Sequence, residues 1–156
     1  MSQRNFADIK RLFSQLIGMK LDMLHFAGDM SMWRFSSDSA KAYLHVQCSY
    51  RFTCDNQTIL CQRDFNTIVS QEKFNTLLHA ERDLLAMYVF PIHIDNVSVY
   101  DNFDVRIDFQ NNISLYIYAD LPAMDEQWRF WKDDYSAKKN LSYIAIDGTM
   151  KTVKNE

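Results

Sequence analysis

The alternation of apolar and polar residues is sharpest in the segment YLHVQCSYRF, residues 43–52. Its apolar side holds Leu44, Val46, Cys48, Tyr50 and Phe52, and its polar side holds Tyr43, His45, Gln47, Ser49 and Arg51. A period of two is that of a β-strand with one buried face. We therefore expect one long strand here, whose polar side is either a functional surface or a solvated face.

Helical spacing predicts a first helix over residues 6–17, ended by Gly18, and a second over 70–90, ended before Pro91. Strand-like segments cover residues 20–26, 32–35, 42–52, 59–65, 97–101, 105–110, 113–121, 126–134 and 141–147. Short turns join neighbouring strands, which favours antiparallel pairing. The predicted fold class is α+β, a mostly antiparallel sheet of about eight strands with two helices, in the order α-ββββ-α-βββββ.

The segment TCDNQTIL predicts a hairpin after the long strand, with its turn centred on residues 56–57. In that register Gln62 lies opposite Arg51, and Asp64 lies opposite Ser49. Both residues would then join the polar side of the strand.

Size and charge narrow the class of protein. A chain of 156 residues, 47% hydrophobic and 24% charged, is expected to form a single globular domain over residues 1–156. A formal net charge of −3 offers no basic stripe for nucleic acid. The longest apolar run, residues 84–92, is too short to span a bilayer, so no membrane association is expected.

The three cysteines, Cys48, Cys54 and Cys61, are an odd number and match no zinc or redox motif. Free thiols in a reducing compartment are the expected state. The N-terminal segment lacks the apolar stretch of a secretory signal. The sequence thus favours a cytoplasmic location.

The polar side of the long strand is the first candidate site. A histidine for general base chemistry, an arginine for an anion and an aspartate to orient either would come from His45, Arg51 and Asp64, with Gln47 and Ser49 beside them. Ser49 is two strand steps from His45, which is too far for a nucleophile and its base. The competing interpretation is a solvated face with an ordinary ion pair between Arg51 and Asp64.

The segment EQWRFW, residues 126–131, is the second candidate. Trp128 shares one side of a strand with Phe130, and Arg129 shares the other with Trp131. Tryptophan and arginine are enriched in interface hot spots, which makes Trp128 and Arg129 candidate binding residues. The competing interpretation is a core strand in which Trp128 and Phe130 pack inward.

The sequence gives little support for a metal site or a cofactor site. His93 and Asp95 share one strand face, but two such residues do not make a metal site. Three glycines are too few for a phosphate-binding loop. We expect no metal and no cofactor.

Two segments carry a resemblance to a known group. Leu44–Arg51 and Glu126–Arg129 resemble small bacterial proteins of unknown function, in which a strand reading Leu-His-(Val/Ile)-Gln-Cys-x-(Trp/Tyr)-Arg precedes a Glu-x-Trp-Arg segment. Tyr50 stands where tryptophan is commoner in that group. The resemblance implies a bacterial cytoplasmic domain of the kind encoded beside toxins as immunity proteins, and it assigns no catalytic residue.

Two functions therefore remain open. The first is a non-enzymatic interaction domain that binds a protein partner, toxin-like or other, through the candidate residues. The second is a small ligand-binding domain or enzyme in which His45, Arg51 and Asp64 converge in a pocket. Exposed sheet edges also leave a homodimer open.

Overall fold

The structure is a computed structural model that describes residues 3–27, 30–62, 70, 72, 92–119, 126–134 and 142–146. One helix, α1 (Gln3–Ser14), begins the chain. The strands that follow before residue 63 are β1 (Lys20–Ala27), β2 (Met30–Ser36), β3 (Ala40–Val46), β4 (Ser49–Cys54) and β5 (Gln57–Cys61). The later strands are β6 (Ile92–Val99), β7 (Val105–Phe109), β8 (Ile113–Tyr118), β9 (Trp128–Asp134) and β10 (Ser142–Ile146).

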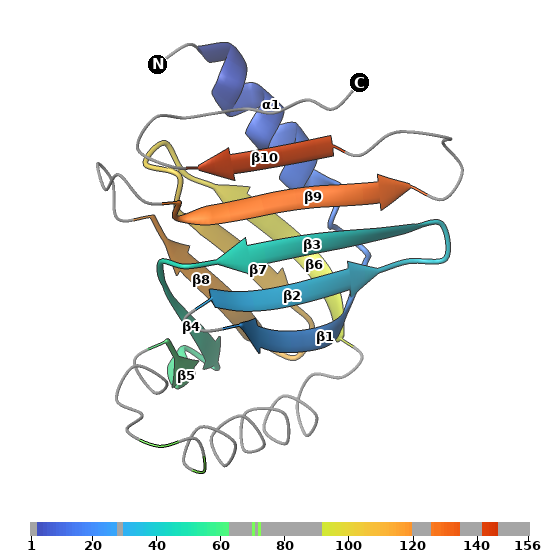
Figure 1. The fold of residues 1–156 in the computed structure, drawn as a ribbon. Helices are drawn as coiled ribbons and strands as arrows, with labels where there is room; N and C mark the ends of the chain where they lie inside the picture. The colour runs from blue at the N-terminus through green and yellow to red at the C-terminus, as the bar shows by residue number, and fades with distance from the viewer. Residues whose placement is uncertain are drawn as a thin grey trace.

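All ten strands belong to one antiparallel sheet in the order β10-β9-β3-β2-β1-β6-β7-β8-β4-β5. The sheet is folded over into two layers, because β1 and β6 pair only at Lys20 with His93 and at Leu21 with Ile92. Strands β10, β9, β3, β2 and β1 form what we call the front layer, and β6, β7, β8, β4 and β5 form the back layer behind it (Figure 1). Each layer therefore has an inner face toward the other layer and an outer face away from it.

The core fills the space between the two inner faces. Trp33 of β2 meets the rings of Tyr50 and Phe52 of β4 edge-on, with ring centres 5.0 and 5.8 Å apart. Helix α1 closes one end, where Phe13 stacks on Phe130 of β9 at 4.8 Å and meets Trp128 edge-on at 5.1 Å. The buried apolar residues of α1 and of both layers form one continuous cluster.

The long strand expected over residues 42–52 is in fact two strands in different layers. The chain leaves β3 in the front layer and enters β4 in the back layer at Gln47 and Cys48, whose backbone amides both donate to the carbonyl of Gln127. The alternation of buried and exposed residues continues through this break. It does so because β3 and β4 line the same core from opposite sides.

The β4–β5 hairpin has a different register from the expected one. Asp55 and Asn56, with φ of 49° and 64°, form the two-residue turn, and Cys54 pairs with Gln57. Two consecutive residues of positive φ are typical of a type I′ turn, which asparagine and aspartate tolerate. A bulge follows in β5, so that Cys61 rather than Gln62 lies opposite Arg51. The expected turn at residues 56–57 is therefore wrong by one position.

The α+β class and the mostly antiparallel sheet are confirmed. The described residues contain ten strands rather than about eight, and one helix. The second helix expected over 70–90, and with it the predicted element order, falls on a range of which only Ser70 and Glu72 are described. No helix in the described part of the chain is long and apolar enough to cross a membrane.

Candidate functional site

The structure divides the residues that the sequence grouped on one polar side. His45 lies on the outer face of the front layer, whereas Ser49 and Arg51 lie on the outer face of the back layer. Gln47 stands at the crossover between the layers, and Asp64 lies outside the described residues. A site that joins His45 to Arg51 is therefore excluded by the fold, because the core separates them.

The outer face of the front layer carries an aromatic cluster around β3 and β9. Tyr43 pairs with Trp131 across these strands, and their rings stack with centres 5.1 Å apart and planes 15° apart. His45 meets the same indole edge-on at 4.5 Å and 78°. All three side chains are half-buried. We call Tyr43, His45 and Trp131 the front-face cluster.

His45 is electrostatically unusual within this cluster. Its Nδ1 atom is buried and has no hydrogen-bond partner among the described residues. Burial, together with the positive charge of Arg129 on the neighbouring strand, lowers the pKa of His45 to about 4. The imidazole is therefore neutral at pH 7 and packs as an aromatic ring.

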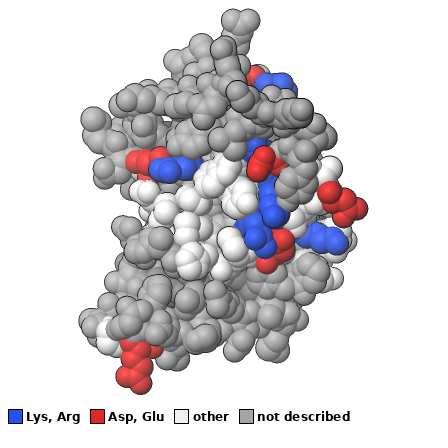
Figure 2. All heavy atoms as spheres, turned by 45° about the vertical axis from the view of Figure 1, so that its right-hand side comes forward, with Lys and Arg blue, Asp and Glu red and all other residues white. Residues whose placement is uncertain are grey.

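Paired charges border the front-face cluster. Arg129 donates from Nε and Nη2 to the two carboxylate oxygens of Glu126, both at 2.8 Å. Arg34 donates to Asp22 at 2.7 Å, and Ser36 donates to the other oxygen of that carboxylate. In Figure 2, which views this side of the molecule obliquely, uncharged surface lies at the centre with charged side chains to its left and right. Each of these arginines is thus neutralised and held in place by its own carboxylate.

Of the two tryptophans on β9, Trp128 is the one that lies in the core. Its side chain is fully buried, and its Nε1 atom donates to the carbonyl of Phe103 at 3.1 Å. The binding role expected for Trp128 is therefore wrong, and the competing core interpretation is right. Trp131, on the opposite side of the same strand, is the tryptophan that reaches the outer face. The alternation along residues 126–131 contained this signal, because Trp131 shares its side with Arg129.

The outer face of the back layer carries a row of arginine and tyrosine side chains. Arg51 lies over the rings of Tyr116 and Tyr118, at 5.4 and 5.2 Å from their centres. Arg106 lies over Tyr116 at 5.2 Å, and it also pairs with Asp108 at 2.7 Å. We call Arg106, Tyr116, Arg51 and Tyr118 the arginine–tyrosine ladder. Neither this row nor the place of Arg106 in it could be predicted from the sequence. The row forms only when β7, β8 and β4 lie side by side.

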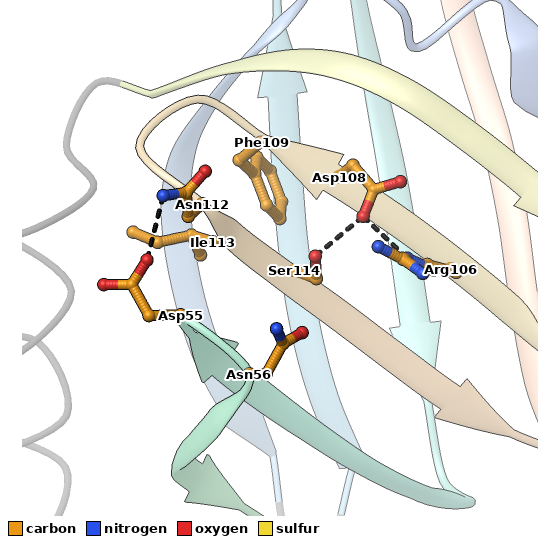
Figure 3. Close-up of a pocket in the computed structure, with 8 residues that line it drawn as sticks. All are labelled: Asp55, Asn56, Arg106, Asp108, Phe109, Asn112, Ile113 and Ser114. Atoms are coloured by element: carbon orange, nitrogen blue, oxygen red, sulfur yellow. Dashed lines mark hydrogen bonds and ion pairs between the residues drawn. The ribbon is translucent and has the colours of Figure 1, made fainter.

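A pocket of about 460 Å³ lies beside the ladder, where the β4–β5 and β7–β8 turns meet (Figure 3). Its polar lining is mostly paired within itself: Asn112 donates to Asp55 at 2.8 Å, and Ser114 and Arg106 both donate to Asp108 at 2.7 Å. No cluster of three or more histidine, cysteine or acidic side chains that would hold a metal ion occurs within the described ranges. These hydrogen bonds join the two turns and leave few free groups for chemistry.

Comparison of the chain with protein families, curated proteins and solved structures found no match. Residues 44–51 and 126–129, which lie far apart in the sequence, meet in the fold. His45 pairs with Arg129, and Val46 pairs with Trp128, across the β3–β9 ladder. Of the front-face cluster, His45 belongs to these segments, and Tyr43 and Trp131 lie next to them on the same two strands.

Proposed function

We propose that this protein is a non-enzymatic interaction domain that binds a protein partner through the front-face cluster and its bordering arginines. The stacked pair of Tyr43 and Trp131 on the outer face of the front layer carries the proposal. Interface centres are depleted in charge and enriched in tryptophan, tyrosine, methionine and arginine. Met32, half-buried between His25 and His45, adds to this composition.

The rigidity of the surface also supports binding. The cluster stands on two hydrogen-bonded strands, β3 and β9, and β3 is held on its other side by β2. Both Arg34 and Arg129 are fixed by carboxylates. Side chains that are already ordered lose little conformational entropy when a partner binds. Because the charges are paired, the surface is suited to a partner that contacts aromatic rings rather than to a nucleic acid.

Catalysis at the polar residues fits the geometry less well. The alternative function requires His45, Arg51 and Asp64 to converge, whereas His45 and Arg51 lie on opposite outer faces. A histidine with a pKa of about 4 is also a weak general base at neutral pH. In its concrete form the proposal is an immunity-type protein of the bacterial cytoplasm with a toxin-like partner, and this form rests on the resemblance of the two strand segments.

Native mass spectrometry of the tagged protein, purified gently from its own cells, tests the proposal. We expect a stoichiometric second protein that is lost in Trp131→Ala and kept in Tyr100→Ala. Tyr100 is a matched control, because it is an aromatic residue with 47% of its surface exposed and lies on the β6–β7 turn. Circular dichroism of both variants checks that they remain folded.

Two outcomes would contradict the proposal. A partner that Trp131→Ala retains would place the contact elsewhere on the protein. A doubled mass of this chain alone, lost in Trp131→Ala, would identify the surface as a homodimer interface rather than a site for another protein.

A further inference from the structure

Arg51 differs from the other arginines whose side chains the structure describes. Four of them pair with a carboxylate: Arg11 with Asp8, Arg34 with Asp22, Arg106 with Asp108, and Arg129 with Glu126. Arg51 has no carboxylate partner within the described part of the chain, and it is exposed. No carboxylate of the described residues therefore neutralises its positive charge on the outer face of the back layer.

The tyrosines of the ladder hold this charge in place without cancelling it. Tyr116 and Tyr118 lie parallel, with planes 8° apart and ring centres 6.3 Å apart, and Arg51 lies over both. Stacking on an aromatic face orders a guanidinium and leaves the N–H groups at its edge available. Those N–H groups form the planar fork that recognises carboxylate and phosphate oxygens in pairs.

The hydroxyl of Tyr118 lies at the same place. It is buried, and no described residue pairs with it at full hydrogen-bonding geometry. A buried hydroxyl without a well-formed hydrogen bond costs on the order of 1–3 kcal/mol, which a ligand atom would relieve. Burial raises the pKa of Tyr118, whereas the charge of Arg51 and the interaction of its side chain with this hydroxyl act in the opposite direction, so the hydroxyl keeps its proton and can donate it. Ser49, which is exposed and faces Tyr118 across β4 and β8, supplies another hydroxyl.

We propose that Arg51, together with the hydroxyl groups of Tyr118 and Ser49, binds an oxyanion, either a carboxylate or a phosphoryl group. This site is on the opposite side of the molecule from the front-face cluster and does not depend on the function proposed for that surface. The neighbouring pocket is a poorer place for an anion, because Asp55 and Asp108 outnumber Arg106 there (Figure 3). Anion binding is therefore directed to Arg51 and not to Arg106.

Titration with inorganic phosphate and with acetate tests the site, with chloride at equal ionic strength as the reference. The Nε–Hε resonance of Arg51 in nitrogen-15 NMR spectra is the readout, assigned by its absence from the Arg51→Lys spectrum. We expect a saturable shift with phosphate, acetate or both that chloride does not reproduce. The anion that saturates the site distinguishes a phosphoryl ligand from a carboxylate.

Variants then locate the binding, with isothermal calorimetry as a readout that does not need the Arg51 signal. Arg51→Gln is expected to abolish binding, and Arg51→Lys, which keeps the charge but loses the fork, to weaken it about tenfold or more. Tyr118→Phe, which removes one hydrogen bond, is expected to weaken it about two- to tenfold. Arg11→Gln, an exposed arginine on α1, is the matched control and should bind as the parent does.

The proposal is overturned if neither anion saturates the signal, or if chloride produces the same shift. It is also overturned if Arg51→Gln, folded by circular dichroism, still binds the anion as tightly as Arg11→Gln does. A partner protein lost in Trp131→Ala but kept in Arg51→Gln would leave both proposals standing, since the two sites are separate.

Discussion

Tyr43 and Trp131 lie face to face across β3 and β9, with their ring planes 15° apart and their ring centres 5.1 Å apart. The pair stands on the outer face of the front layer, where each ring keeps part of its surface exposed. The same indole also receives the edge of His45. One tryptophan thus organises the front-face cluster, and several measurable properties depend on it.

The stack of Tyr43 and Trp131 should be measurable as a coupling energy. A double-mutant cycle with Tyr43→Ala and Trp131→Ala, followed by urea unfolding, is expected to give about 0.5–1.5 kcal/mol of coupling, as for other aromatic pairs. The control is a cycle of Trp131→Ala with Tyr100→Ala, which is expected to be additive within about 0.5 kcal/mol. Additivity of Tyr43→Ala and Trp131→Ala would show that the rings contribute independently.

His45 should make the protein less stable in mild acid. Its pKa of about 4 in the folded protein lies below the ordinary histidine value of 6.5, so the unfolded chain takes up the proton first as the pH falls. The contribution of His45 to the free energy of unfolding is therefore fully present above pH 6.5 and is lost between pH 6.5 and about 4. Because one proton is involved, the slope approaches roughly 1.4 kcal/mol per pH unit.

Urea unfolding of the parent and of His45→Gln across this pH range checks the prediction. The difference between the two proteins removes the contribution of other titrating groups. We expect the variant to lose less stability on acidification than the parent does. Parallel pH profiles would mean that His45 takes up its proton equally easily in both states.

The two tryptophans of β9 should respond differently to the same substitution. Trp128→Phe removes the hydrogen bond to the carbonyl of Phe103 and opens space in the core, so we expect a loss of about 2 kcal/mol or more. Trp131→Phe keeps a ring on the outer face and is expected to cost less than about 1 kcal/mol. Urea unfolding measures both, and equal losses would contradict the assignment of Trp128 to the core and Trp131 to the surface.

The β4–β5 turn should favour glycine at Asn56, whose φ is 64°. Asn56→Gly is expected to leave the free energy of unfolding unchanged or slightly higher, whereas Asn56→Ala should lower it by about 1 kcal/mol, because alanine is strained at positive φ. Gln57→Ala, at the exposed first position of β5, is the control and should change stability by less than about 0.5 kcal/mol. If Gln57→Ala were the more harmful change, the turn would be centred one residue later than the structure has it.

Much of this fold can be predicted from local sequence patterns. The alternation in residues 43–52 and 126–131 identified correctly which side chains share a side, because the direction of a side chain along a strand depends only on its own backbone. The helix before Gly18 and the nine strand segments were also predicted, and each strand segment overlaps at least one observed strand, although β6 begins at Ile92, five residues before the segment predicted for it. The turn of the β4–β5 hairpin lies one residue earlier than expected, so the pairing beside it is shifted by two positions, and the bulge in β5 reduces this shift to one at Arg51.

The candidate site was predicted less well. The choice between Trp128 and Trp131 as the buried tryptophan depends on Phe13 of α1, which packs against β9 although it lies far away in the sequence. Arg106 and Tyr116 gave no signal of their own, since they become neighbours of Arg51 only when β8 lies between β7 and β4. Contacts between strands distant in sequence are set by the packing of the whole sheet.

The sequence by itself determined which side chains of residues 43–52 face the core and which face away from it. Only the tertiary structure decided that the outward side chains reach two different surfaces, with His45 on one and Arg51 on the other. The break at Gln47 and Cys48 does not interrupt the alternation of buried and exposed residues, because the apolar residues of β3 and β4 both face the same core. A local period reports whether a residue is buried, but the layer to which each strand belongs follows from its hydrogen bonds to β9 on one side of the core and to β8 on the other.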